Sequence, residues 1–104
     1  MDIFTALSDP VRRQLIEALW QRGPLSIKQL GEGLQISRQA VTKHLDMLIK
    51  AKLVSARYAG KERIHELNPR PMEKVALWLQ PFAEQWDDRL SRLKVYLGEQ
   101  HEQD

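Results

Sequence analysis

Residues 26–48, SIKQLGEGLQISRQAVTKHLDML, contain two stretches with helical spacing and a break between them. Each stretch begins at a serine, Ser26 or Ser37, whose hydroxyl can accept hydrogen bonds from the first free N–H groups of a helix. Gln29 stands at the capping-box distance from Ser26. The residues expected on the core faces are Ile27, Leu30 and Leu34, then Val41, Leu45 and Leu48. The pattern predicts two packed helices joined by a turn, the second running to about Ala51 with a polar outer face.

The segment before this pair predicts two more helices. Asp9 can cap a helix whose first position is Pro10, and the apolar spacing continues to about Gln21 before Gly23 and Pro24 end it. Residues 3–7, IFTAL, are expected to form a short helix of their own.

The segment after the pair predicts a β-hairpin and then more helix. Residues 53–58 and 62–67 have the composition of strands, with a turn at 59–61. Residues 69–80 are expected to be helical, with Pro81 breaking or kinking the helix or opening a new one. Residues 82–97 then carry apolar side chains at steps of three and four. The expected fold is mainly α with a small β-hairpin, a winged helix-turn-helix with N- and C-terminal dimerisation helices. We expect a single domain over 1–104, with a core of about 9–68 and dimerisation helices at about 3–7 and 69–98.

Charge is unevenly distributed along the chain, although the net charge is only +2. Residues 26–70 contain nine basic and four acidic side chains, a net charge of +5, whereas residues 71–104 have a net charge of −3. A basic middle region favours a polyanionic partner, although ordinary surface variation is the alternative. The sequence has no signal peptide and no apolar run long enough for a membrane span, so a cytoplasmic location is expected.

The second helix of the pair carries side chains suited to DNA. Arginine can bind guanine through two hydrogen bonds, glutamine can bind adenine, and threonine can contact phosphate or the thymine methyl group. The N-terminal part of such a helix meets base edges in the major groove. The candidate DNA-binding residues are Ser37, Arg38, Gln39, Thr42, Lys43 and His44. The alternative is an ordinary solvated amphipathic helix.

The hairpin is a second candidate contact. Arg57, Lys61 and Arg63, with Tyr58 between them, can lie along the DNA backbone or enter the minor groove. A solvated hairpin tip is the alternative.

The apolar residues at the two ends of the chain are too many for one small domain to bury, and such a patch usually marks an interface. A symmetric dimer would also present two copies of the DNA-binding helix to two half-sites. The alternative is that these residues simply cover the core. The candidate interface residues are Ile3, Phe4, Leu7, Phe82, Trp86, Leu90, Leu93 and Leu97.

Metal, cofactor and enzyme chemistry are poorly supported by the sequence. Cysteine is absent, and His44, His65 and His101 lack the spacing of metal ligands. Asp87 and Asp88 are adjacent on a helix and do not face one site. Neither a phosphate-binding glycine loop nor a nucleophile with a base at a familiar spacing is recognisable. We expect no catalysis, no metal and no cofactor.

Three segments together resemble the ArsR family of winged-helix repressors. They are LSDPVRRQLIEAL, PLSIKQLGEGLQISRQAVTKHLDMLIKAKLV and the R-x-x-G-K-E-R hairpin, and the resemblance covers roughly residues 3–98. It implies a homodimer that binds operator DNA and represses transcription, with the terminal helices at the interface. The family's metal sites find no matching residues here. Gln35 stands where the family's turn commonly has glycine, so a positive φ there would be strained.

The predicted function is therefore that of a homodimeric transcriptional repressor that binds double-stranded DNA without metal sensing, with any small-molecule effector unknown. Two other readings stay open. One is a winged-helix module that binds proteins. The other is a small-molecule sensor with a pocket between the terminal helices and the core, lined by Trp78 and Trp86.

Overall fold

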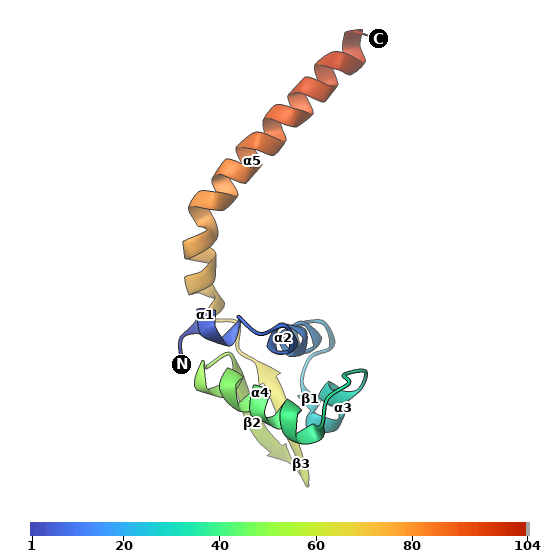
Figure 1. Cartoon of the computed structure of the whole chain (residues 1–104), viewed down its shortest axis with the longest axis vertical. Helices are drawn as coiled ribbons and strands as arrows, with labels where there is room; N and C mark the ends of the chain where they lie inside the picture. The colour runs from blue at the N-terminus through green and yellow to red at the C-terminus, as the bar shows by residue number, and fades with distance from the viewer. Residues whose placement is uncertain (104) are drawn as a thin grey trace. The chain divides into compact units, whose positions relative to one another are not determined.

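The computed structural model describes the backbone of residues 1–103 and the side chains of residues 1–98. The chain divides into two units, one spanning Met1–Glu73 and the other beginning at Lys74, a boundary inside the segment predicted as the C-terminal dimerisation helix. The first unit holds α1 (Ile3–Ala6), α2 (Pro10–Arg22), β1 (Leu25–Ser26), α3 (Ile27–Gly31), α4 (Arg38–Lys50), β2 (Val54–Ala59) and β3 (Glu62–Leu67). The long helix α5 (Met72–Gln103) begins just before this boundary and, from Lys74 on, belongs to the second unit (Figure 1).

The predicted helix caps are confirmed. The Asp9 carboxylate accepts hydrogen bonds from the backbone N–H groups of Val11 and Arg12, at 2.8 and 3.2 Å, and so begins α2. Ser26 and Gln29 form the reciprocal capping box of α3. These bonds satisfy N–H groups that have no partner within the helix itself, which is why the helices begin at these residues.

The turn between α3 and α4 differs from the prediction in two ways. Helix α3 ends at Gly31, so Leu34 lies in the turn, half-buried, and not in the helix. The positive φ of the turn falls on Gly33, at 82°, and not on Gln35. Because glycine adopts this conformation without steric cost, the turn forms without the strain expected at Gln35.

The hairpin is confirmed and belongs to a three-stranded antiparallel sheet of order β1-β3-β2. The sequence did not predict β1, a two-residue strand in which Leu25 pairs with His65 and Ser26 with Ile64. Such a short strand carries no periodic signal of its own. Its pairing fixes the start of α3 against the middle strand of the sheet.

The core of the first unit lies where α2 and α4 pack on each other and on the sheet (Figure 1). Its most completely buried apolar side chains are Leu15, Val41, Leu45, Leu48 and Leu53. Helix α1 contributes to the same burial, because Ile3 is only 5% exposed and Ala6 is fully buried. Ile3 was predicted to lie at a dimer interface, but its side chain is already buried within the single chain.

Helix α5 continues through Pro81 without a break. Of the three predicted alternatives at Pro81, the break and the new helix are therefore wrong, and Figure 1 shows one continuous ribbon. Proline removes one backbone hydrogen bond from a helix but does not always end it. None of the helices in the described part of the chain is both long and apolar enough to cross a membrane.

Candidate nucleic-acid interface

Four of the predicted DNA-binding residues lie together on the outer face of α4. Arg38, Gln39, Thr42 and Lys43 line one shallow hollow, and all but the half-buried Thr42 are exposed. The Ser37 hydroxyl accepts a hydrogen bond from the backbone N–H of Ala40 at 3.1 Å, so Ser37 serves mainly as the cap of α4. The Thr42 hydroxyl donates to the carbonyl of Arg38 at 3.0 Å, which leaves its methyl group for outside contacts.

The hairpin register separates the predicted hairpin cations. Tyr58 pairs with Arg63, and Arg57 pairs with Ile64. Directly paired residues share a face and successive residues alternate, so Arg57 and Arg63 lie on opposite faces. The face of Arg63 also carries the buried His65, so it is the face turned toward the helices. The expectation that Arg57 acts together with Arg63 does not fit this register.

A cationic hollow joins α4 to the hairpin. It has a volume of about 210 Å³, and four basic side chains line it: Lys28, Arg38, Lys61 and Arg63. Glu62 is the only acidic residue in the lining. None of the four cations has an ion-pair partner among the residues whose side chains are described. Such a concentration of unpaired positive charge favours an anion.

Lys28 was not predicted as a site residue. It lies in α3, where the sequence pattern showed only a helix that supports the next one. Its charge counted toward the basic middle region, but its position beside Arg38 depends on how α3 packs against α4.

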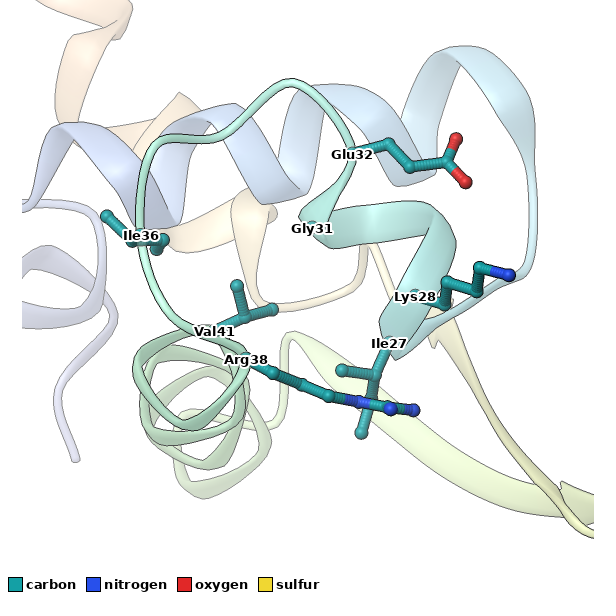
Figure 2. A pocket seen from close by; sticks show the side chains of 7 residues that line it. All are labelled: Ile27, Lys28, Gly31, Glu32, Ile36, Arg38 and Val41. Atoms are coloured by element: carbon teal, nitrogen blue, oxygen red, sulfur yellow. The ribbon is translucent and has the colours of Figure 1, made fainter.

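A second hollow lies within the helix-turn-helix itself (Figure 2). It has a volume of about 240 Å³, with Ile27, Ile36 and Val41 as its apolar lining. Arg38 also lines this hollow. The same side chain lines the cationic hollow and the shallow hollow formed by Gln39, Thr42 and Lys43 on α4. Gly31 also lines the hollow of Figure 2, and a Cβ atom there would meet Val41 Cγ2 at 3.7 Å, an ordinary contact. Close approach of α4 therefore does not require a glycine at this position.

His44 is directed toward α2, not to the predicted DNA face. Its Nδ1 atom lies 3.4 Å from Nη1 of Arg12 and 4.0 Å from Oδ1 of Asp9. Burial acts to raise the pKa of Asp9, but hydrogen bonds from the backbone of Arg12 and Val11 and the nearby charges of His44 and Arg12 outweigh it and lower the pKa. Asp9 is therefore held as a carboxylate beside the His44 ring.

His65 is buried beneath the hairpin, at 1% exposure. Its Nδ1 atom has no hydrogen-bond partner in the described part of the chain. Burial lowers the pKa of His65, and the charge of Arg63 lowers it further, against weaker opposing effects from the Leu25 backbone and Asp46. The ring is therefore neutral at physiological pH, which makes it a structural side chain of the sheet. His101 lies outside the residues whose side chains are described.

Of the predicted interface residues, those on α5 are exposed. Trp86 is 61% exposed and Leu93 51%. Phe82, Leu90 and Leu97 are exposed as well, and the rings of Trp78 and Phe82 stack at an angle with centroids 5.3 Å apart. Phe4 is at 36% exposure and Leu7 is half-buried in the first unit. Within the described residues, no cluster of three or more histidine, aspartate or glutamate side chains could hold a metal ion.

A helix-turn-helix followed by a hairpin with a cationic hollow between them defines a winged-helix DNA-binding domain. Comparisons agree with this class, because the model of a helix-turn-helix domain family matches residues 7–56. The chain is 44% identical over 64 residues to the HTH-type transcriptional regulator Rv2034 of Mycobacterium tuberculosis. That match covers 62% of this chain and 59% of the length of Rv2034. The chain is thus a helix-turn-helix transcriptional regulator and not an enzyme.

Two further matches cover more of the chain, and the second of them identifies the family. The transcriptional repressor SdpR of Bacillus subtilis is 27% identical over 89 residues, which are 86% of this chain and 98% of SdpR. The solved structure of an ArsR-like transcriptional regulator from Rhodococcus sp. RHA1 superposes with a TM-score of 0.65 at 33% identity. It covers 88% of this chain and 86% of that one. The chain belongs to the ArsR family of winged-helix transcriptional regulators.

Proposed function

We propose that this regulator is a homodimeric repressor that binds a specific double-stranded operator and does not sense metals. The observation that carries the DNA-binding part is the cationic hollow, where Lys28 and Arg38 of the helix-turn-helix meet Lys61 and Arg63 of the hairpin. A backbone phosphate held there would leave the outer face of α4 in the major groove. Phosphate contacts would then set the position, and base contacts the specificity.

Arg38 and Gln39 are the proposed base-reading residues. They are exposed at the N-terminal end of α4, the part of such a helix that meets base edges. Thr42 and Lys43 lie one turn further on and fit contacts with a thymine methyl group and with phosphate. His44 is not among the proposed base readers, because its ring is engaged with Arg12 and Asp9.

Homodimerisation is proposed from the exposed apolar side chains of α5. Large apolar side chains such as Trp86 and Leu93 are seldom left exposed in such numbers along one helix unless another surface covers them. A two-fold dimer would bind two half-sites about one helical turn of DNA apart, so that their affinities combine.

Repression without metal sensing is proposed from the similarity to SdpR, whose name states that it is a transcriptional repressor, and from the absence of cysteine. A reporter gene placed behind the selected operator should be silenced by the protein. Addition of Zn²⁺ or arsenite should not change the affinity of the protein for its operator.

The decisive experiment selects a duplex from a random pool and measures its affinity against a scrambled duplex over a range of salt concentrations. Arg38→Ala or Gln39→Ala should weaken operator binding by roughly 1–3 kcal/mol and relax sequence preference, whereas Lys61→Ala should reduce the salt slope by about 1. Arg22→Ala removes an exposed cation of the same unit outside the hollows and serves as the control. Salt-insensitive or absent duplex binding by the unmodified protein would favour a protein-interaction module instead.

Dimerisation has its own test. Leu93→Glu should convert the sedimenting species from dimer to monomer at micromolar concentration and remove operator binding, while far-ultraviolet circular dichroism shows the helices still formed. A monomer in the unmodified protein at the same concentration would contradict the dimer proposal.

A further inference from the structure

We propose that Asp9 and Arg12 are positioning residues for α4, and that they act through His44 to link the docking of α1 to the orientation of the DNA-binding face. This proposal rests on the proposed function, in which α4 reads DNA. It assigns to His44 an internal role in place of direct DNA contact.

Arg12 connects three helices through one guanidinium group. Its Nε donates to the carbonyl of Ala6 at 2.7 Å, and its Nη2 donates to the carbonyl of Thr5 at 3.1 Å. Both carbonyls lie at the C-terminal end of α1, where helix carbonyls lack partners within the helix. The remaining nitrogen, Nη1, lies 3.4 Å from Nδ1 of His44 on α4. The planar guanidinium thus holds the end of α1 and the side of α4 in a fixed relation.

Asp9 gives the same histidine nitrogen a second partner. Its Oδ1 atom caps α2 through Val11 and Arg12 and lies 4.0 Å from Nδ1 of His44. A neutral ring with a lone pair at Nδ1 accepts from Arg12, whereas a ring protonated at Nδ1 is attracted to Asp9. The charged groups that face this nitrogen from α2 are therefore Asp9 and Arg12, while α1 contributes only backbone carbonyls, through Arg12.

His44 is well placed to fix the rotation of α4 about its axis. It follows directly after Lys43 and lies beside the buried Leu45, so it stands between the outer face and the core face of the helix. A helix turns as a rigid body, so a side chain tethered on this flank also sets where Gln39 and Lys43 point. Base contacts depend on that orientation to within an ångström, whereas phosphate contacts through long lysine side chains tolerate more movement.

The test compares operator affinity with scrambled-duplex affinity in the full-length protein. His44→Leu removes the nitrogen and should weaken operator binding about tenfold, within the usual range of coupling between sites. Its affinity for scrambled duplex should stay unchanged. His44→Asn places an amide oxygen near the position of Nδ1 and should restore most of the operator affinity. Gln14→Leu, an exposed polar-to-leucine change on α2, is the matched control and should change neither affinity.

A double-mutant cycle tests the link itself. Arg12→Ala and His44→Leu should each reduce operator affinity, and the double variant should lose little more than one of them alone, because both break the same contact. Additive losses would overturn the link. An equal loss of operator and scrambled-duplex binding in folded His44→Leu would also overturn it, because His44 would then contact DNA directly.

Thermal melting without DNA separates this proposal from the proposed function. The decreases in melting temperature caused by Arg12→Ala and His44→Leu should also be non-additive in the double variant, because the contact exists in the free chain. If the unmodified protein fails to bind DNA while the melting cycle shows coupling, the proposed function fails and the structural link stands. Should a leucine or alanine variant not fold, a cycle of His44→Phe, which keeps a ring but has no nitrogen, with Arg12→Lys tests the same contact with milder changes.

Discussion

Arg57 and Arg63 lie on opposite faces of the β2–β3 hairpin, because Arg57 pairs with Ile64 while Arg63 pairs with Tyr58. Arg63 lines the cationic hollow with Arg38 and Lys28, whereas Arg57 does not. The three hairpin cations, Arg57, Lys61 and Arg63, therefore do not lie on one surface. The strand register determines which of them can bind the same anion as Arg38 of α4.

We predict unequal effects of the two arginines on DNA binding. Arg63→Ala should reduce the salt slope of operator binding by about 1, as expected for one lost phosphate contact. Arg57→Ala, which removes the same charge from the other face, should change the slope less. Fluorescence anisotropy with a labelled operator at several salt concentrations measures both slopes. Equal reductions would show that the hairpin uses both faces.

His65 predicts a pH dependence of stability. Its pKa in the folded chain lies below the usual value of 6.5, so below that pH the unfolded chain binds more protons than the folded one. The contribution of the neutral His65 ring to the free energy of unfolding is therefore fully present above pH 6.5. It is lost as the pH falls from 6.5 toward the lowered pKa of the folded chain, with a slope of at most about 1.4 kcal/mol per pH unit. Urea unfolding at a series of pH values measures it. His65→Gln has no titrating ring and should show a flatter profile over the same range. An unchanged profile would show that another group titrates.

Gly31→Ala should stabilise the protein. Glycine costs roughly 0.5–1 kcal/mol relative to alanine within a helix. The new Cβ would meet Val41 Cγ2 at an ordinary contact distance of 3.7 Å. Urea unfolding should therefore give a free energy of unfolding higher by about that amount. A lower value would mean that α3 and α4 approach each other more closely at this point than the Cβ position allows.

Lys52→Gly should also stabilise the protein, for a different reason. Lys52 has a φ of 63° and is the only non-glycine residue with positive φ in the part of the chain that the structure describes. A left-handed conformation costs an ordinary residue about 1 kcal/mol, which glycine avoids. The matched control is Lys50→Gly, in the last turn of α4, where glycine should lower the free energy of unfolding by about 1 kcal/mol. If both variants are destabilised, the positive φ of Lys52 carries no strain.

The helices that begin at capped residues and the hairpin that follows them could be predicted from the sequence alone. Asp9, Ser26 and Ser37 begin helices through bonds to backbone groups two or three residues away, so the signal and the structure lie in the same short segment. The strands show an equally local pattern, and the predicted turn at 59–61 includes the Gly60 that adopts a positive φ between them. Arg38, Gln39 and Lys43 could be predicted as outer-face residues because the core residues of α4 recur at helical spacing.

Which of these residues act together depends on how the helices and strands pack. His44 looks like an outer-face residue in the sequence, and only the packing of α2 against α4 brings it to Arg12, 32 positions away. Lys28 joins Arg38 and Arg63 because α3, α4 and the hairpin converge, and Ile3 is buried because α1 packs into the core. Helix caps and periodicity are local interactions that a short segment expresses alone. Contacts between distant segments depend on how whole elements pack and pair, and a single sequence does not contain that arrangement in any one stretch.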